Sequence, residues 1–209
     1  MERSPRLAVL LSAGGTTLQN LIDRIADSRL RARIEVVIAS RPDAGGLQRA
    51  RNAGIPAVAV SRKAFADVDR FNDALHAALA RYDVDLIVLA GFLSPFQLRT
   101  RYAGRVLNIH PALIPAFCGK GFYGEKVHRA VLEAGVKVTG CTIHFADDEY
   151  DHGPIVLQGA VPVLDDDTTE TLAARVHALE NELYPEAIRL WAADRLEIVG
   201  RRVKIRRPS

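Results

Sequence analysis

Near-continuous apolar runs alternate with helix-period patterns along the first half of the chain. Such runs are typical of strands buried on both faces, and we place them at residues 7–11, 34–39, 57–60, 86–90 and 106–109. Between them, apolar residues recur at spacings of three and four, which predicts helices over about 18–25, 47–53 and 71–79. Strands that alternate with helices indicate an α/β fold, with a Rossmann-like, mostly parallel sheet and helices on both faces.

The second half of the chain follows a different pattern. A glycine-rich loop at 117–124 leads into a predicted helix at 127–134, and two longer strands, at 137–145 and 155–163, are expected to be antiparallel neighbours. A long helix follows the acidic run 165–167, and Pro185 is expected to kink or interrupt it. A short hairpin is predicted at 196–199 and 203–205. We expect a single domain over residues 1–209, with halves at 1–110 and 111–209.

The composition excludes several classes of protein. Hydrophobic residues make up 48% and charged residues 25% of the 209 residues, as in ordinary globular chains. Much of the net charge of +3 lies in the tail 201–207, so charge does not indicate a nucleic-acid partner. Cys118 and Cys141 form no CxxC pair, which fits a reduced cytoplasmic compartment. The first apolar run is too short to span a membrane and no signal-peptide pattern surrounds it, so we expect no membrane association.

Two polar side chains mark the end of the strand at 106–109. Asn108 and His110 point to the same face, because side chains alternate along a strand, and the strand then stops at Pro111. An amide can donate hydrogen bonds to a developing oxyanion, and an imidazole can carry a proton near neutral pH. A carboxylate such as Asp151 would raise the imidazole pKa and orient the ring. For the Asn-x-His pair alone, the favoured interpretation is a structural strand end.

A glycine loop at residues 12–17 lies between the first predicted strand and the first helix. Exposed amides at a helix N-terminus, together with the helix dipole, favour an anion such as phosphate. The GxGxxG spacing of a dinucleotide site and the Gly-Lys-Ser/Thr of a P-loop are both absent. A tight turn in which Thr16 or Thr17 caps the helix is the equally weighted alternative.

An acidic loop follows the strand at 137–145, in which Thr142 and His144 share one face. The loop gathers four carboxylates, and hard cations bind clustered carboxylates. However, the spacing matches no calcium loop, and no histidine or cysteine pair supports zinc. The alternative is that one carboxylate is catalytic and the others are ordinary loop residues. The four carboxylates are Asp147, Asp148, Glu149 and Asp151.

Taken together, these motifs resemble those of the glycinamide ribonucleotide formyltransferases, the folate-dependent enzymes of purine synthesis. The resemblance runs from residue 7 to about residue 191. Two of its marks are shared with the wider formyltransferase superfamily, whereas the glycine loop and the chain length point to the ribonucleotide enzymes. The marks are Asn108-Ile109-His110-Pro111 with Ile114-Pro115, Asp151 before Gly153-Pro154-Ile155, the loop Ser12-x-Gly14-Gly15-Thr16-x-Leu18-Gln19, Leu89-Ala90-Gly91-Phe92, and Glu180 before Tyr184-Pro185.

The resemblance implies a metal-free reaction in which the amine of phosphoribosylglycinamide attacks the formyl carbon of 10-formyltetrahydrofolate. Asn108 and protonated His110 would stabilise the oxyanion, while Asp151 would hold His110 and a water that passes the proton to the folate nitrogen. Residues 1–110 would bind the ribonucleotide phosphate and 111–209 would carry the folate site, in a monomer or homodimer. The implied binding residues are Gly15, Thr16 and Thr17 for phosphate, Glu180 for ribose, and Phe92, Leu93, Asp147 and Asp148 for folate, with Thr142 and His144 in support and a cis bond at Ile114–Pro115.

The chain departs from the family pattern at two points. Leu93 leads directly to Ser94-Pro95, two residues shorter than in relatives, and Thr17 stands where relatives often have asparagine. The alternatives are a 10-formyltetrahydrofolate hydrolase, a methionyl-tRNA formyltransferase and a non-catalytic ligand-binding relative. The first two carry an additional domain that this chain length does not accommodate. The joint presence of Asn108, His110 and Asp151 argues against the third.

Overall fold

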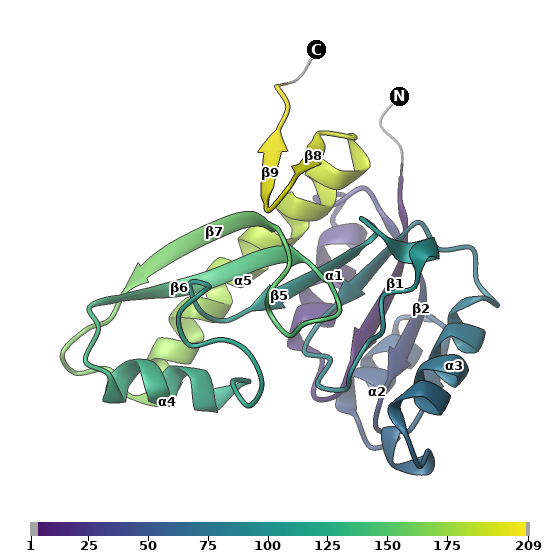
Figure 1. Cartoon of the computed structure of the whole chain (residues 1–209), viewed down its shortest axis with the longest axis horizontal. Coiled ribbons are helices and arrows are strands. Elements are labelled where there is room, and N and C mark those ends of the chain that lie inside the picture. The colour runs from purple at the N-terminus through teal and green to yellow at the C-terminus, as the bar shows by residue number, and fades with distance from the viewer. Residues whose placement is uncertain (1–3, 208–209) are drawn as a thin grey trace. The chain divides into compact units, whose positions relative to one another are not determined.

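The computed structural model describes residues 4–207 of the chain, which form two compact units that divide between Leu107 and Asn108. Both units combine helices with strands, as the α/β prediction requires (Figure 1). Within residues 4–207, no helix combines the length and the apolar character needed to cross a bilayer.

The first unit contains a parallel sheet. Its strands are hydrogen-bonded in the order β3-β2-β1-β4, and every pair that they form is parallel. Right-handed crossovers put α1 and α2 on one face of such a sheet and α3 on the other, because the chain reverses direction between β3 and β4. The elements are β1 (Arg6–Leu11), α1 (Thr16–Ala26), β2 (Arg33–Ala39), α2 (Gly45–Asn52), β3 (Ala57–Ala59), η1 (Arg62–Ala64), α3 (Val68–Leu79), β4 (Leu86–Leu89) and η2 (Thr100–Tyr102).

The core of the first unit lies around β1, whose residues 7–11 are fully buried. Their near-continuous apolar run is thus confirmed as a central strand covered on both faces. Burial of each leucine contributes about 1.5–3 kcal/mol. The ring of Phe71, on α3, stacks on that of Phe92, with centroids 6.5 Å apart. This packing fixes the segment that follows β4.

The second unit is built on two hairpins and a long helix. Strands β6 and β7 are antiparallel, as are β8 and β9, so both predicted pairings are confirmed. The terminal hairpin joins β7 through one parallel pair, Ile155 with Arg202. The unit boundary falls inside β5 (Val106–His110), and the remaining elements are α4 (Glu125–Glu133), β6 (Val138–Phe145), β7 (Ile155–Pro162), α5 (Thr169–Ala192), β8 (Leu196–Val199) and β9 (Arg202–Ile205).

Two glycines let β6, β7 and α5 approach closely. A Cβ built on Gly140 of β6 would collide with the carbonyl of Gly159 on β7. A Cβ on Gly159 would lie 2.6 Å from Leu183 and 2.8 Å from Leu179, both on α5. The helix therefore packs directly on the backbone of the hairpin, along which it runs in Figure 1.

Helix α5 begins with a capping box and continues through its proline. Thr168 and Thr171 exchange side chain-to-backbone hydrogen bonds at the first turn, and the Asp167 carboxylate accepts from the guanidinium of Arg175. The acidic run before the helix thus takes part in its start. The expectation that Pro185 interrupts the helix was wrong, since one segment runs from Thr169 to Ala192. Pro185 has no backbone N–H to donate to the preceding turn. Both Pro185 and Tyr184 are buried, and this packing keeps that turn helical.

Candidate active site

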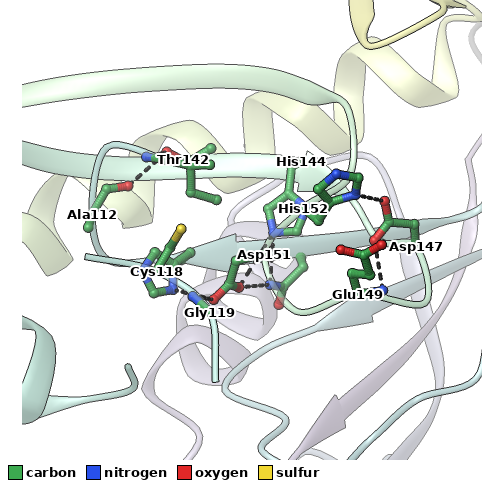
Figure 2. Close-up of polar contacts among 12 residues, drawn as sticks. Ala112, Cys118, Gly119, Thr142, His144, Asp147, Glu149, Asp151 and His152 are labelled. Carbon is green, nitrogen blue, oxygen red and sulfur yellow. Dashed lines mark hydrogen bonds and ion pairs between the residues drawn. The ribbon is translucent and has the colours of Figure 1, made fainter. Parts of the chain in front are cut away.

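Asp151 is the centre of a polar cluster in the second unit. It lies in the loop between β6 and β7, with a positive φ of 54°, a conformation that aspartate tolerates better than most residues. The amide of Gly119 donates to Asp151 Oδ2 over 2.9 Å (Figure 2). Asp151 Oδ1 accepts from Asn108 Nδ2 over 3.3 Å. Burial would raise the Asp151 pKa, but the neighbouring His144 and His110 and the Gly119 amide outweigh it and keep the pKa below its ordinary value. Asp151 is therefore ionised at neutral pH.

The ring of His110 lies between two oxygen acceptors. Its Nε2 is 2.8 Å from the carbonyl of Phe117 and its Nδ1 is 3.4 Å from Asp151 Oδ2. A carbonyl can only accept, so Nε2 carries a proton, and only the imidazolium could donate to both oxygens. Burial nevertheless lowers the His110 pKa below 6.5, because desolvation outweighs the opposing charge of Asp151. Asp151 acts in the expected direction, but the net rise in the imidazole pKa expected from it does not occur.

His144 fixes the orientation of the Asn108 amide. His144 Nδ1 lies 2.9 Å from the carbonyl of Phe145, so it carries the ring proton and leaves Nε2 as an acceptor. Asn108 Nδ2 donates to that Nε2 over 3.0 Å. The other hydrogen of Nδ2 makes only the long contact to Asp151, so it can be redirected to another acceptor. We call Asn108, His110, His144 and Asp151 the Asp151 cluster.

Thr142 supports the turn that follows β5. Its hydroxyl donates to the carbonyl of Ala112 over 2.7 Å and accepts from the amide of Ile114 over 3.1 Å (Figure 2). Gln158 Nε2 also donates to this hydroxyl and to the carbonyl of Ile114. The Ile114–Pro115 bond is cis, as predicted. Thr142 therefore holds the turn and makes none of the contacts within the Asp151 cluster.

In the first unit, the glycine loop ends at the start of α1. The interpretation that Thr16 or Thr17 caps the helix was wrong, since Gly15 is the N-cap and no side chain caps it. Gly15 has a φ of 76°, and a Cβ there would lie 2.7 Å from the Cα of Gly46. The first-turn amides are left to an external acceptor, as an anion site requires.

Sequence reasoning overlooked a cation beside this loop. Arg49 Nε donates to the carbonyl of Gly14 over 2.8 Å, and its Nη1 donates to Gln19 Oε1 over 3.1 Å. The guanidinium adds positive charge next to the helix N-terminus. Arg49 lies 35 residues from Gly14 in the sequence, so no local sequence pattern predicts this contact.

The four candidate folate residues occupy different environments. In the first unit Phe92 is buried against Phe71, whereas Leu93 is 47% exposed and its amide donates to Ser12 Oγ over 2.8 Å. In the second unit Asp147 accepts from the amide of Glu149 and from His152 Nδ1. Asp148 lies in the same loop. Phe92 is thus a core residue, and Leu93 is the exposed one of this pair.

Glu180 is a buried carboxyl on α5. Burial raises its pKa to about 8, so it is largely protonated at neutral pH. Its Oε2 lies 3.7 Å from Nδ1 of His177, one turn earlier on α5. Burial of the nearby Cys141 thiol, together with the Glu180 charge, raises the thiol pKa to about 12. A neutral carboxyl can donate a hydrogen bond to a hydroxyl group as well as accept one from it.

His128 is a histidine of helix α4. Its side chain is buried beside the ring of His177, with centroids 6.2 Å apart. Within residues 4–207, neither ring nitrogen has a hydrogen-bond partner. Burial lowers its pKa to about 4, so the ring is neutral above that pH. Helical periodicity marks this position as inward-facing but cannot reveal unpaired nitrogens.

The acidic loop does not form a metal site in the described residues. No group of three or more histidine, cysteine, aspartate or glutamate side chains within residues 4–207 is arranged to hold a metal ion. Asp147 and Asp151 instead have separate partners (Figure 2). The Asp151 cluster provides an amide donor, an imidazole and an ionised carboxylate, which are the groups needed to stabilise an oxyanion and move a proton.

Comparisons with known proteins agree with this chemistry. Residues 5–188 match the model of the Formyl transferase family. The chain is 39% identical over 198 residues to the chloroplastic phosphoribosylglycinamide formyltransferase of Arabidopsis thaliana, covering 93% of this chain and 68% of the relative. It is 39% identical over 196 residues to the phosphoribosylglycinamide formyltransferase of Haemophilus influenzae, covering 92% of this chain and 90% of the relative.

A solved structure has the same fold. Glycinamide ribonucleotide transformylase 1 from Symbiobacterium toebii superposes with a TM-score of 0.88 at 46% identity, covering 98% of this chain and 95% of that one. The chain spans 63% of the length of the chloroplastic relative from Vigna unguiculata, and 19% of the human trifunctional purine biosynthetic protein adenosine-3.

Proposed function

Because this chain belongs to the Formyl transferase family, and within it to the phosphoribosylglycinamide formyltransferases, we propose that it transfers a formyl group from 10-formyltetrahydrofolate to the amine of 5′-phosphoribosylglycinamide. This is a step of de novo purine synthesis. The observation that carries the proposal is the geometry of Asn108, His110 and Asp151.

The first step is attack of the amine nitrogen on the formyl carbon. The carbonyl π bond breaks and its electrons become an oxyanion. Asn108 is the first candidate donor, since His144 orients its amide and one hydrogen makes only the 3.3 Å contact. Burial lowers the His110 pKa, so its ring must gain a proton during the reaction to supply positive charge to the same oxyanion, and the ionised Asp151 favours that protonated form. Removal of one such donor costs about 10²–10³-fold in kcat in other enzymes.

The second step is proton transfer. The attacking nitrogen is positively charged and must lose a proton. The oxyanion then re-forms the carbonyl bond as the bond between the carbon and the folate nitrogen breaks, and that nitrogen gains the proton. Asp151 is ionised at neutral pH and lies beside His110, so it stabilises the imidazolium and can hold a water that carries the proton. The balance requires no oxidant, reductant or metal.

Substrate binding is assigned to groups in both units. We assign the phosphate to the first-turn amides at Gly15, Thr16 and Thr17, with Arg49 adding positive charge. We assign the ribose to Glu180, whose protonated carboxyl can pair with hydroxyl groups. The folate is assigned to Leu93, Asp147 and Asp148, and Phe92 supports Leu93 from the core.

The remaining assignments concern domain organisation, cellular location and assembly. We propose a single formyltransferase domain over residues 1–209, in which 1–110 binds the ribonucleotide phosphate and 111–209 carries the folate site. A cytoplasmic location is supported by the free thiols of Cys118 and Cys141. The monomer or homodimer expected from the resemblance stays a prediction, as does the absence of a nucleic-acid partner.

The test is an assay of tetrahydrofolate release from 10-formyltetrahydrofolate with and without phosphoribosylglycinamide. We expect release only with the ribonucleotide, with one formylated product formed per folate released. Release at the same rate without the ribonucleotide would establish the hydrolase instead. Binding of both compounds with no release would establish a non-catalytic relative.

A further inference from the structure

The loop that carries Asp151 is bound by an arginine from the terminal hairpin. Arg201 lies at the turn between β8 and β9, and its Nη2 donates to the carbonyl of His152 over 2.9 Å. Its Nη1 lies 2.6 Å from His152 Nε2. Arg201 thus contacts both the backbone and the ring of the residue next to Asp151.

The contact continues across the loop. A guanidinium only donates, so His152 Nε2 accepts and its Nδ1 carries the proton. That Nδ1 donates to Asp147 Oδ2 over 2.7 Å (Figure 2), and Asp147 Oδ1 accepts from the amide of Glu149 over 3.0 Å. We call Arg201, His152 and Asp147 the arginine brace. It joins the beginning of the loop to its end, on either side of Asp151.

The backbone at Asp151 needs such a constraint. Its φ of 54° lies in the left-handed region, which is strained for a residue with a Cβ. The carboxylate meets the Gly119 amide and His110 only while this conformation holds. The parallel pair of Ile155 with Arg202 anchors the hairpin to the strand that follows the loop.

We propose that Arg201 is a positioning residue that holds the Asp151 carboxylate in place through the backbone of His152. The inference rests on the proposed role of Asp151 in formyl transfer. Exposed ion pairs contribute little to global stability, and the His152 side chain is 43% exposed, so the brace acts on the loop and leaves the fold unchanged. Arg201 also lies beyond residue 188, where the family match ends.

The first test compares Arg201→Ala with Arg202→Ala. Arg202 is the next residue, is exposed, and carries the same charge, so it is a matched control. We expect Arg201→Ala to lower kcat about 10-fold with little change in the KM for the ribonucleotide, whose assigned residues lie outside the brace, because misplacement of a reacting group acts on the chemical step. Arg201→Lys, which keeps a donor, should recover part of the loss. Unchanged kcat in Arg201→Ala, or an equal loss in Arg202→Ala, would overturn the proposal.

A double-mutant cycle separates this role from a general one. In an Asp151→Asn background, Arg201→Ala should have no further effect on kcat, because it acts only through Asp151. Additive losses would show that Arg201 acts elsewhere and would overturn the proposal.

A readout without catalysis uses the Gly119 amide. Its NMR resonance reports the bond to Asp151, and it should shift in Arg201→Ala but not in Arg202→Ala. No shift would contradict the positioning role. The two proposals fail in different ways. A wild-type protein without ribonucleotide-dependent transfer would contradict the proposed function, whereas an active wild type with an equally active Arg201→Ala would contradict only the role of Arg201.

Discussion

In the first unit, residues 15–17 offer backbone N–H groups at the start of α1, whereas in the second unit Asp151 lies among an amide and two buried histidines. The glycine loop needs space for its main chain, since a Cβ at Gly15 would press on Gly46. The Asp151 cluster needs particular side chains in particular protonation states. The first site is therefore sensitive to shape, and the second to chemistry and pH.

This difference predicts which substitutions affect which measurement. A change of side-chain chemistry at the Asp151 cluster should act on turnover, while added volume in the glycine loop should act on the binding of one substrate. The following experiments test that separation.

The largest effect is expected for Asp151→Asn. Asparagine keeps the shape and tolerates the positive φ, but it removes the charge that stabilises the His110 imidazolium. We expect kcat for formyl transfer to fall by about 10²-fold or more, and the same for His110→Ala. The control is Asp165→Asn, which removes an exposed carboxylate paired with Lys137. Near wild-type turnover of Asp151→Asn would remove this residue from the mechanism.

The next effect concerns pH and Glu180. Its pKa is about 8 in the folded protein and near 4.5 when unfolded, so the folded state holds the extra proton between these values. Stability from this group is complete below pH 4.5 and is lost as pH rises toward 8. The free energy of unfolding of the wild-type protein should therefore fall by about 2 kcal/mol between pH 6.5 and 8.5 because of this group. Glu180→Gln should abolish that fall.

This window lies above the range in which His128 titrates. Burial lowers the His128 pKa to about 4, so His128 contributes the opposite slope, but only between about pH 4 and 6.5. Denaturant unfolding at several pH values measures the difference between variant and wild type. Glu186→Gln, at a more exposed glutamate of α5, is the control. Parallel pH curves for wild type and Glu180→Gln would contradict the raised pKa.

A smaller effect is expected for Gly15→Val. The added side chain would press on Gly46 and would occupy a left-handed backbone conformation. We expect the Kd for the ribonucleotide to rise about 10-fold, or about 1.4 kcal/mol, with little change in the folate Kd. Gly14→Ala is the matched control, because a Cβ at Gly14 meets no atom within 4 Å. Equal weakening of both substrates would argue that the loop is only structural.

The smallest effect is expected for Thr168→Ala. This change removes the capping box of α5 and should lower the free energy of unfolding by about 1 kcal/mol. Because the hydrogen bonds of Thr168 belong to the first turn of α5, and none of the assigned catalytic or binding residues lies there, kcat and KM should stay unchanged. A change in either constant would show that the start of α5 is coupled to catalysis.

The strands were predictable because burial on both faces leaves an unbroken apolar run. The run at 7–11 is recovered as Arg6–Leu11, and that at 106–109 as Val106–His110. Local rules failed where tertiary packing decides, as at Pro185, which packing keeps inside α5. They failed again at α1, where the close approach of Gly46 selects glycine as the N-cap instead of a threonine.

The combination of motifs was enough to propose Asn108, His110 and Asp151 as a site, but it could not give their distances or hydrogen-bond partners. Asn108 and His110 share a strand face, which periodicity reveals, whereas the bond from Gly119 to Asp151 joins segments 32 residues apart. The net direction of the His110 pKa also depended on burial, which the sequence pattern could not weigh against the charge of Asp151. Arg201 is 49 residues from His152, and nothing local marks their contact.

The glycines between β6, β7 and α5 have a consequence for any survey of mutational tolerance. Every substitution at Gly140 or Gly159 adds atoms where backbone or leucine side chains already lie. In an activity-based selection these positions would score as severely as Asp151, although they perform no chemistry. Cellular abundance would separate them, because the glycine variants would be lost before they could act, while Asp151→Asn would accumulate as inactive protein.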